Sequence, residues 1–472
     1  MTTIVWFRQD LRLSDNPALS WAAERGEVIP VYILDETGNA PYGRMGGASR
    51  WWLHHSLKAL SAALGGLHIL KGDPEALLKD LADKSKADAI SWNRCYEPHA
   101  IARDRKIKKT FQDLGLEAKS FNGNLLHEPW DFQTKAGGPY KVFTPFWRAL
   151  RPAGMNMPLP RPKARIVTPR SGETLKGLAL LPEKPDWAAG WDDIWTPGEK
   201  GARDRLDAFL ENGLAGYGDG RNRPDLEKVS RLSPHLHFGE ISPRQIVTAT
   251  RLACERISSL AREGEKFLSE IGWREFSYHL LCHFPDLPEK NLRSDFDAYP
   301  WRESADDLKA WQRGMTGYPL VDAGMRQLWQ TGWMHNRVRM VTASFLIKHL
   351  RIDWRQGEAW FWDTLVDADL ANNSASWQWV AGSGADAAPY FRIFNPVSQG
   401  RKFDPAGVYV RRWCPELSKL PDKYLHAPFE APVNVMEEAG ITLGTDYPLP
   451  IVDHAEARKA ALAGYERVRK TG

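Results

Sequence analysis

Residues 3–34 read TIVWFRQDLRLSDNPALSWAAERGEVIPVYIL and decide how the chain begins to fold. The runs Ile4–Phe7 and Val28–Leu34 are apolar and rich in β-branched and aromatic residues, which is typical of buried strands. Between them, Asp15-Asn16-Pro17 predicts the start of a helix and Gly26 predicts its end. A strand, a helix and a second strand in this order predict a parallel β-α-β unit.

The same alternation continues to about residue 128. Further strands are predicted at Leu67–Leu70, Ala89–Trp92 and Ala118–Phe121, and further helices at Ser49–Leu64, Pro74–Lys84 and Pro98–Leu114. We therefore expect residues 1–128 to form an α/β domain with an open, Rossmann-like parallel sheet that helices cover on both faces. No GxGxxG follows the first strand, so the standard dinucleotide fingerprint is missing.

The rest of the chain changes character twice. Residues 129–198 hold eleven prolines and predict a long connector that wraps over both domains. Residues 199–472 predict an all-α domain, because apolar positions recur at helical spacing. The expected helices are Arg203–Asn212, Pro243–Ser259, Glu263–Leu281, Ala305–Arg313, Pro319–Thr331, Asn336–His349, Glu358–Val366 and the terminal Asp453–Lys470.

Composition narrows the class of protein. A chain of 472 residues is too long for one core, and its net charge of +4 does not decide for or against a nucleic-acid partner. The four cysteines lie far apart with no CxxC, so we expect neither disulfides nor a metal site, and a reducing, cytoplasmic compartment. We see no leader and no apolar run long enough to cross a membrane, and we expect a monomer.

The tryptophans are unusually concentrated. Eleven of the 21 fall between Trp273 and Trp413. Tryptophan is large, and its indole N–H needs a partner when it is buried. Tryptophan also gives up an electron more readily than most side chains. The helical region is therefore either a heavily aromatic core or a medium for electron transfer, and core packing is the default for any single one of these tryptophans.

Two segments indicate a ligand site. In Ser230–Gly239, Ser233 followed by Pro234 predicts a helix cap and first turn, which is either an anion site or an ordinary capped helix. In the second segment, three- and four-residue spacing puts four side chains on one helix face, either to hold a planar polar ligand or as a surface Glu–Arg pair beside a core tryptophan. They are Glu270, Trp273, Arg274 and Ser277.

The segment Gly332–Met340 is polar within a helix that otherwise looks buried. Buried Asn and Arg side chains need partners, and we expect Asp367 and Asp369 to supply them, as a structural ion pair or as part of a site. Further along, Asn373 and Trp377 lie four residues apart, and the polar and aromatic run continues to Pro396.

Together these blocks resemble the photolyase/cryptochrome flavoproteins over essentially the whole chain, including the opening Val5–Arg12. Within that family the chain is most similar to photolyases for cyclobutane pyrimidine dimers, from the class III-like branch close to plant cryptochromes. Photolyases for (6-4) photoproducts carry a histidine-rich segment where this chain has Trp333–Arg337, and plant cryptochromes typically carry aspartate at Asn373. The alternative is a blue-light receptor that repairs nothing.

The resemblance implies that the helical domain binds FAD, fully reduced in the active state. It implies Asn373 at flavin N5, where an amide suits a reduced flavin, and an Arg339–Asp367 pair against the ring. The implied FAD-binding residues are Tyr217, Val229, Ser230, Arg231, Leu232, Ser233, Arg274, Arg339, Asp367, Asp369 and Asn373.

The resemblance also implies damaged DNA as the partner, with the pyrimidine dimer flipped out of the duplex. The implied lesion contacts are Trp273, Trp379, Met340 and Glu270, whose carboxyl hydrogen-bonds the pyrimidine carbonyls; the implied backbone contacts are Arg221, Asn336, Arg337 and Gln399. Glu270 and Trp273 therefore count as both catalytic and DNA-binding.

Two light-related roles complete the expectation. Trp377, Trp354 and Trp301 match the family's tryptophan chain for photoreduction, with Trp377 nearest the flavin and Trp301 nearest solvent, while branches through Trp360 and Trp362 stay open. An antenna pigment is expected in the α/β domain. Folate-binding relatives carry Asn and Glu where this chain has His99 and Ala100, so we expect methenyltetrahydrofolate in a different pose, with a deazaflavin or no antenna as alternatives.

Overall fold

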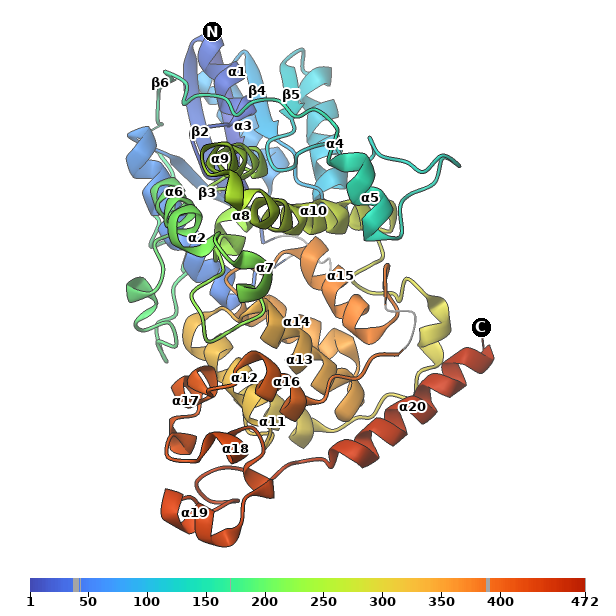
Figure 1. The fold of residues 1–472 in the computed structure, drawn as a ribbon. Helices are drawn as coiled ribbons and strands as arrows, with labels where there is room; N and C mark the ends of the chain where they lie inside the picture. Colours follow the sequence, from blue (N-terminus) through green and yellow to red (C-terminus); the bar gives the residue numbers. More distant parts are fainter. Residues whose placement is uncertain (37–41, 43, 170, 388–390, 472) are drawn as a thin grey trace. The chain divides into compact units, whose positions relative to one another are not determined.

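The computed structural model describes residues 1–36, 42, 44–169, 171–387 and 391–471 (Figure 1). The chain divides into two compact units. Unit 1 comprises Met1–Ala215, Ser230–Pro285 and Val366–Ala371, and unit 2 comprises Gly216–Val229, Asp286–Leu365 and Asn372–Gly472. Each unit thus draws on three stretches of sequence, and the expected division at residues 128 and 198 stays a prediction.

A parallel sheet forms the core of the N-terminal part of unit 1. Its strands are β1 (Thr2–Phe7), β2 (Glu27–Leu34), β3 (His68–Lys71), β4 (Ala89–Asn93) and β5 (Glu117–Phe121), in the order β3-β2-β1-β4-β5. All five predicted strands are confirmed, with small shifts at their ends. The strand order reverses between β1 and β4, which is where open α/β sheets usually leave a ligand crevice.

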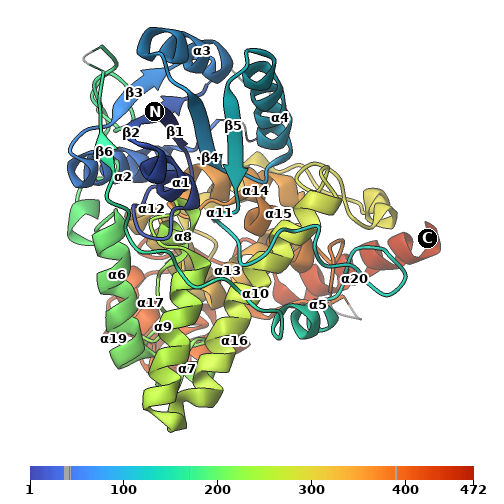
Figure 2. The ribbon, with the colours of Figure 1, turned by 90° about the horizontal axis from the view of Figure 1, so that it is seen from above.

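Helices cover both faces of this sheet, as predicted (Figure 2). Helix α1 (Pro17–Arg25) starts where Asn16 accepts a hydrogen bond from the Leu19 N–H, and it packs against the central strands. The opposite face carries α3 (Pro74–Ser85) and α4 (Pro98–Asp113), whose apolar side chains join those of β1, β2 and β4 in one buried cluster. Helix α2 spans Gly47–Leu64.

The proline-rich connector contains structure that its sequence did not reveal. Residues Arg165–Ile166 form a two-residue strand, β6, that pairs in parallel with the start of β2. Phe143–Leu150 form helix α5, which packs on α10 (Ala261–His283) in the same unit. A strand of two residues carries no periodic signal, whereas α5 has aromatic residues at helical spacing.

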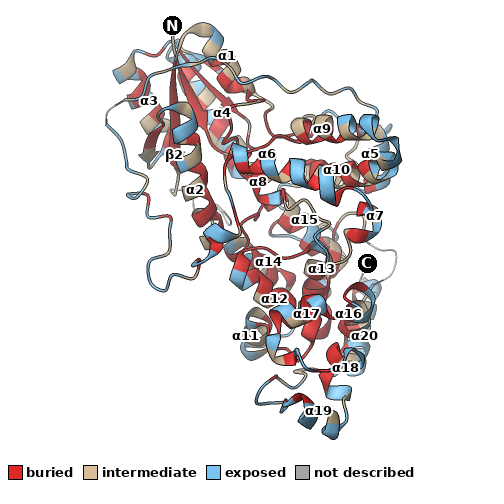
Figure 3. Cartoon of the chain, turned by 60° about the vertical axis from the view of Figure 1, so that its left-hand side comes forward, coloured by how far each residue is buried: buried red, intermediate tan, exposed pale blue. Residues whose placement is uncertain are grey.

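The remaining helices largely confirm the predicted ones. They are α6 (Glu199–Ala208), α7 (Tyr217–Gly220), α8 (Ser233–His237), α9 (Pro243–Arg256), α11 (Ala305–Arg313), α12 (Pro319–Thr331), α13 (Asn336–Ser344), α14 (Trp354–Thr364), α15 (Leu370–Ala381), α16 (Pro396–Phe403), α17 (Val408–Trp413), α18 (Asp422–Leu425), α19 (Val433–Ala439) and α20 (His454–Thr471). Figure 3 shows buried residues along α10 and α12.

Several helix boundaries differ from the predictions, among them the start of α6, which is Glu199 and not Arg203. The predicted helices 203–212 and 336–349 each end in a π-helix, at Phe209–Gly213 and Phe345–His349. Helix α14 starts at Trp354, four residues before the predicted Glu358, because Asp353 caps it by accepting from the Arg355 N–H. Such a cap is a local polar contact that apolar periodicity does not detect.

Candidate functional site

Helix α10 presents the predicted polar face. Arg274 and Ser277 are buried on it, while Glu270 and Trp273 keep part of their surface exposed. Arg274 donates to the Asn124 carbonyl (2.8 Å), and its guanidinium lies 4.8 Å from the Tyr278 ring centre. Glu270 pairs with Lys266 (3.2 Å) on the same helix. Because Arg274 is buried, it does not form the surface Glu–Arg pair that was the predicted alternative.

The chain segment that leaves the sheet fixes α10 in place. Besides the Arg274 bond, Glu275 accepts from the Leu126 N–H (2.9 Å), and His279 contacts the Pro129 carbonyl through Nδ1 (2.8 Å). Burial raises the pKa of Glu275 to about 7, although Arg274 opposes the shift. These long-range contacts hold the helix that carries Trp273 rigidly to the loop after β5.

Trp273 has a stacking partner that the sequence did not indicate. Its ring lies parallel to that of Phe143 in α5, with 3.8 Å between ring centres and 8° between planes. Phe276 meets the same indole edge-on at 5.9 Å. Phe143, Phe146 and Trp147 follow the i, i+3, i+4 spacing of an apolar helix face, and that spacing was the available signal.

A second buried cluster in unit 1 surrounds Asp369. Tyr278 donates its hydroxyl to the Asp369 carboxylate, and His237 lies 3.7 Å from the same group. Burial alone would raise the pKa of Asp369, but His237, Arg274 and Tyr278 hold it well below its usual value. A carboxylate that stays ionised in a buried place is suited to accept hydrogen bonds from a polar ligand. His237 was not among the predicted site residues.

The segment Ser230–Ser233 has an unusual backbone. Arg231 adopts φ +51, in the left-handed region that non-glycine residues seldom occupy, and the Leu232 N–H points to the Ser230 hydroxyl (3.4 Å). The predicted cap at Ser233 is wrong, because Ser233 is the first residue of α8 and Leu232 precedes the helix. Strained backbone of this kind concentrates at functional sites.

In unit 2, the amide of Asn373 has a defined orientation. Its Nδ2 donates to the Glu358 carbonyl (3.1 Å), while the neighbouring Ser374 donates to the Glu358 carboxylate (2.6 Å). Because an amide carries its donor and its acceptor on opposite sides, this bond turns Oδ1 away from Glu358. Asn373 is buried, so the amide oxygen is presented in a largely water-free place.

The segment Gly332–Met340 is less buried than predicted. Asn336 is exposed at the start of α13, and Arg337, Arg339 and Met340 are only half-buried, because the helix turns one side to solvent. Arg339 donates to the Met334 carbonyl (2.7 Å). The predicted pairing of these residues with Asp367 and Asp369 stays a prediction.

Arginines gather around Arg337 within unit 2. Arg337 donates to the Asn222 side chain (2.6 Å) and lies over the Phe403 ring of α16, the helix that also carries the half-buried Gln399. Burial lowers the pKa of Arg337, and the nearby charges of Arg221 and Arg392 lower it further. Like charges held together in this way favour an anionic partner. Arg221 itself lies over the Tyr217 ring (5.9 Å).

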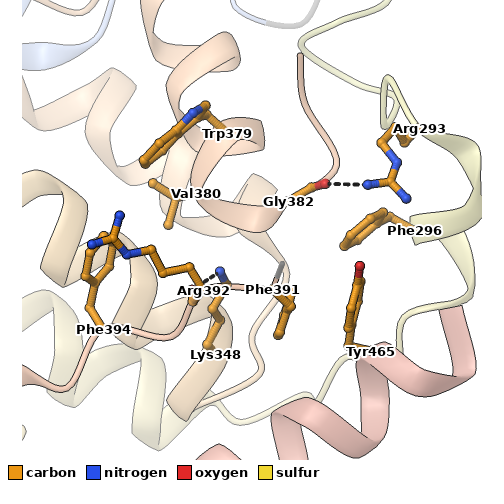
Figure 4. Close-up of a pocket in the computed structure, with 10 residues that line it drawn as sticks. All are labelled: Arg293, Phe296, Lys348, Trp379, Val380, Gly382, Phe391, Arg392, Phe394 and Tyr465. Atoms are coloured by element: carbon orange, nitrogen blue, oxygen red, sulfur yellow. Dashed lines mark hydrogen bonds between the residues drawn. The ribbon is translucent and has the colours of Figure 1, made fainter. Parts of the chain in front are cut away.

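Trp379 borders a pocket in unit 2 (Figure 4). The indole is half-exposed, and its Nε1 donates to the Asp386 carbonyl (3.0 Å). Figure 4 shows Arg293 and Arg392 at opposite ends of the pocket. The complete lining is Arg293, Phe296, Lys348, Trp379, Val380, Gly382, Phe391, Arg392, Phe394 and Tyr465. Aromatic rings and cations without an acidic residue suit an anionic ligand with a flat ring. Residues 388–390, inside the predicted block, lie outside the described residues.

The three tryptophans predicted to carry electrons all lie in unit 2. Trp354 and Trp377 are almost fully buried, with 0% and 2% of their surface exposed, whereas Trp301 is half-exposed beside Tyr299 (4.5 Å). Trp354 donates to the Asn291 side chain (3.0 Å), which satisfies its buried N–H. These exposures fit the predicted direction, from a buried end to a solvent end. The order along the chain stays a prediction.

Among the residues that the structure describes, no cluster of three or more His, Cys, Asp or Glu side chains is placed to hold a metal ion. None of the helices formed by these residues is long and apolar enough to span a membrane.

Comparison with known proteins now identifies the class. A family model described as the FAD binding domain of DNA photolyase matches residues 267–467, and one described as DNA photolyase matches residues 3–163. The chain therefore belongs to the photolyase/cryptochrome flavoprotein family, as the sequence motifs predicted.

Individual relatives indicate which members of the family the chain resembles. The chain is 57% identical to a deoxyribodipyrimidine photo-lyase of Agrobacterium fabrum, over 99% of this chain and 98% of that one. The crystal structure of a bacterial class III photolyase from Agrobacterium tumefaciens matches with a TM-score of 0.95 and 56% identity, covering 99% and 98% of the two chains. Cryptochrome-1 of Arabidopsis thaliana is 41% identical over 97% of this chain and 69% of its own length.

Proposed function

We infer that this protein is a DNA photolyase that uses light to repair cyclobutane pyrimidine dimers. The observation that carries the inference is its similarity, over nearly the full length of both chains, to a deoxyribodipyrimidine photo-lyase. In the repair reaction the dimer accepts one electron, the two bonds that join the pyrimidines break, and the electron is given back. The reaction is a carbon–carbon lyase reaction with no net oxidation or reduction, so no second substrate is consumed.

The cofactor is FAD, which when bound and reduced supplies the light-excited electron donor. The residues present fit it. Asn373 offers its amide oxygen, which can accept a hydrogen bond from an N–H such as that of flavin N5, while buried Arg274 and ionised Asp369 offer a donor and an acceptor. The strained Arg231 lies in the segment proposed for the phosphates. The other residues proposed to hold FAD are Tyr217, Val229, Ser230, Leu232, Ser233, Arg339 and Asp367.

The lesion is held by side chains that keep an exposed surface. Trp273 and Trp379 are both half-exposed, and each offers a flat apolar ring to a flipped pyrimidine dimer. Met340 is also half-buried, and we propose that it contacts the lesion as well. The Glu270 carboxyl donates its O–H to the pyrimidine carbonyls, and this hydrogen bond stabilises the negative charge that the dimer gains.

The DNA backbone is bound by Arg221, Asn336, Arg337 and Gln399. The grouping of Arg221 and Arg337 supports this role, because phosphate contacts fix position without reading sequence, as repair at any site requires. We expect the affinity for DNA to fall steeply with salt. We also expect a monomer in the cytoplasm.

Trp377, Trp354 and Trp301 supply electrons that reduce the cofactor. The burial of the first two supports the proposal, since an electron relay needs rings that water does not surround. Trp301, beside Tyr299, is the solvent end.

Methenyltetrahydrofolate is our proposed antenna. We place it in a groove of unit 1 that is formed largely by α5, α9 and α10, and not by the α/β domain in which the sequence led us to expect it. At the crevice between β1 and β4, Arg8 pairs with Asp104 (3.0 Å) and Gln9 donates to Glu97 (2.6 Å). The groove, by contrast, offers a flat indole and two guanidiniums, which suit a ring system with a carboxylate tail. It is lined by Leu126, His127, Trp147, Leu150, Arg151, Ala153, Met155, Val247, Arg251, Glu265 and Leu268.

Loading the purified protein with this folate tests the antenna proposal. Near-ultraviolet absorbance retained after gel filtration, and lost in Arg251→Ala, would support the groove. Retention that is equal in Arg251→Ala and the wild type would contradict it.

A light-dependent repair assay tests the function itself. The reduced holoprotein is mixed with an oligonucleotide that contains one thymine dimer, and intact thymines are counted after blue light and after darkness. Restoration in light alone supports the photolyase. Its absence, with the flavin bound and reduced, supports the alternative of a blue-light receptor without repair activity.

Glu270→Ala tests the role of the carboxylate. We expect at least about a tenfold loss of repair yield per absorbed photon at saturating DNA, and a smaller loss of affinity, because the bond strengthens as the dimer gains charge. Glu255→Ala, which removes an exposed carboxylate of α9, is the matched control. A loss of affinity with an unchanged repair yield at saturating DNA would make the role of Glu270 one of binding alone.

Asn373→Asp tests the amide. We expect the visible absorption spectrum of the purified protein to show a different resting redox state of the flavin, because a carboxyl group can lose a proton where the amide cannot. An unchanged spectrum would contradict the placement of Asn373 at N5.

A further inference from the structure

The proline-rich connector contributes an aromatic ring that stacks on Trp273. Phe143, the first residue of α5, lies parallel to Trp273 with 3.8 Å between ring centres and 8° between planes. Centres of aromatic pairs usually lie 4.5–7 Å apart, so this pair overlaps more fully than most. Phe143 is 9% exposed, whereas Trp273 is half-exposed. One face of the indole is thus covered by a ring that is itself buried.

Neighbouring rings hold Phe143 in place. Phe276 of α10 meets it edge-on at 6.0 Å, and Trp147, one turn along α5, lies nearly parallel to it at 6.3 Å. The close approach of α5 to α10 depends on Gly272, directly before Trp273. A Cβ atom at this position would lie 2.4 Å from Cε3 of Trp147, well inside van der Waals contact.

The chain on the N-terminal side of α5 is also tied to α10. The Tyr140 N–H donates to Nε2 of His279 (3.0 Å), and Nδ1 of the same imidazole donates to the Pro129 carbonyl (2.8 Å). One side chain of α10 therefore fixes the connector at two points shortly before Phe143. The ring that backs Trp273 is held by backbone contacts as well as by packing.

We propose that Phe143 is a positioning residue, which holds the indole of Trp273 in the plane that receives the flipped pyrimidine dimer. The inference rests on the proposed function. A tryptophan whose ring orientation is fixed before the ligand arrives loses less rotational freedom on binding than one that must be ordered. Without Phe143, the indole can turn about its side-chain bonds, and the flat surface offered to the lesion is lost part of the time.

Phe143 then acts on lesion discrimination more than on general DNA affinity. Undamaged duplex is bound through phosphate contacts, which the orientation of one indole does not alter. A flipped dimer needs the flat ring. We therefore define discrimination as the affinity for an oligonucleotide with one thymine dimer divided by the affinity for the same oligonucleotide without it.

The test compares two phenylalanines of α5 in the FAD-loaded protein. Phe143→Ala is expected to lower discrimination about three- to tenfold, the range of an aromatic stacking contact. Phe143→Tyr keeps the ring and is expected to restore discrimination to within about twofold. The control Phe146→Ala removes a more deeply buried ring, 2% exposed, which packs on Phe276 and His279 and has no stacking contact with Trp273. It is expected to lower the melting temperature at least as much and to leave discrimination unchanged.

Two results would overturn the proposal. One is unchanged discrimination in Phe143→Ala; the other is an equal loss in Phe146→Ala, which would make the effect one of general destabilisation. Should Phe143→Ala fail to fold, Phe143→Leu keeps the apolar volume without the flat ring, and discrimination equal to that of the wild type would overturn the proposal as well. The wild-type repair assay separates this outcome from failure of the proposed function, since wild-type repair in light does not depend on how the variants behave.

Discussion

Two groups of tryptophans in this protein have opposite surroundings. Trp377 and Trp354 are sealed, with 2% and 0% of their surface exposed, whereas Trp273 and Trp379 are half-exposed. The sealed pair is enclosed by apolar rings, a close glycine and one side-chain hydrogen bond. The half-exposed pair offers flat rings beside charged groups. We propose that the two groups have different roles, electron transfer for the buried pair and ligand contact for the partly exposed pair.

Of the changes we predict, Trp377→Phe should have the largest effect. Phenylalanine keeps most of the packing but is much harder to oxidise, so we expect light-driven reduction of the bound flavin to fall by at least about a hundredfold, equivalent to roughly 2.7 kcal/mol on the barrier. Chemically reduced protein should still repair dimers. The measurement is the visible absorbance of the flavin under blue light, followed by the repair assay.

A control for this change is Trp6→Phe. Trp6 is as deeply buried, at 1% exposure, but belongs to the sheet of unit 1. The Trp6→Phe substitution should lower the free energy of unfolding without altering photoreduction. Loss of both photoreduction and repair in Trp377→Phe would show that Trp377 is structural, and that the sealed and the half-exposed groups do not differ in the way we propose.

Gly357→Ala tests the enclosure of the sealed group. A Cβ atom at Gly357 in α14 would lie 2.2 Å from Cη2 of Trp377 and 2.6 Å from Cδ2 of Leu346. Overpacking of this kind costs about 1–3 kcal/mol, so we expect a lower urea midpoint and slower photoreduction. Discrimination for the lesion, which depends on the half-exposed group, should change less.

Gly154→Ala is the matched control, because nothing lies within 4 Å of the added atom. A Gly357→Ala protein as stable as the Gly154→Ala protein would mean that α14 and Trp377 move apart easily. The sealed surroundings of Trp377 would then be of little consequence.

The sheet and the polar face of α10 were predictable, while the support of Trp273 was not. The strands follow from short apolar runs, and the shared face of Glu270, Trp273, Arg274 and Ser277 follows from helical spacing, so both are local properties of the sequence. The contact of Phe143 with Trp273 joins residues that are far apart in the chain. Apolar spacing within α5 indicated a helix face but not what that face would meet.

Capping and exposure also escaped prediction, for different reasons. Ser233 and Pro234 matched the usual start of a helix, yet Leu232 precedes the helix because Arg231 takes a left-handed conformation. Asn336 was expected to be buried, since the rest of its helix looked buried, but it faces solvent at the first turn of α13. In both cases the tertiary surroundings determine the outcome, and these surroundings cannot be read from a single sequence.

The smallest expected effect concerns acid and the support of Trp273. Burial is the main cause that lowers the pKa of His279 to about 4, and His283 lowers it further. An unfolded histidine titrates near 6.5, so the unfolded state binds more protons between these values. Stability is therefore full above about pH 6.5 and is lost as the pH falls towards 4. The loss is at most about 3.5 kcal/mol, at roughly 1.4 kcal/mol per pKa unit.

Protonation of His279 should affect Trp273, one of the two half-exposed tryptophans, before it affects the buried tryptophans. Protonated Nε2 cannot accept from the Tyr140 N–H, which frees the connector beside Phe143. We expect discrimination for the lesion to fall as the pH is lowered from about 5 through 4, where native His279 takes up its proton, while photoreduction through Trp377 changes less. His279→Gln keeps a donor and an acceptor but does not titrate, so its urea midpoint should vary less with pH than that of the wild type. Parallel pH curves for the two proteins would show that another group governs the acid response and that the connector is held by packing alone.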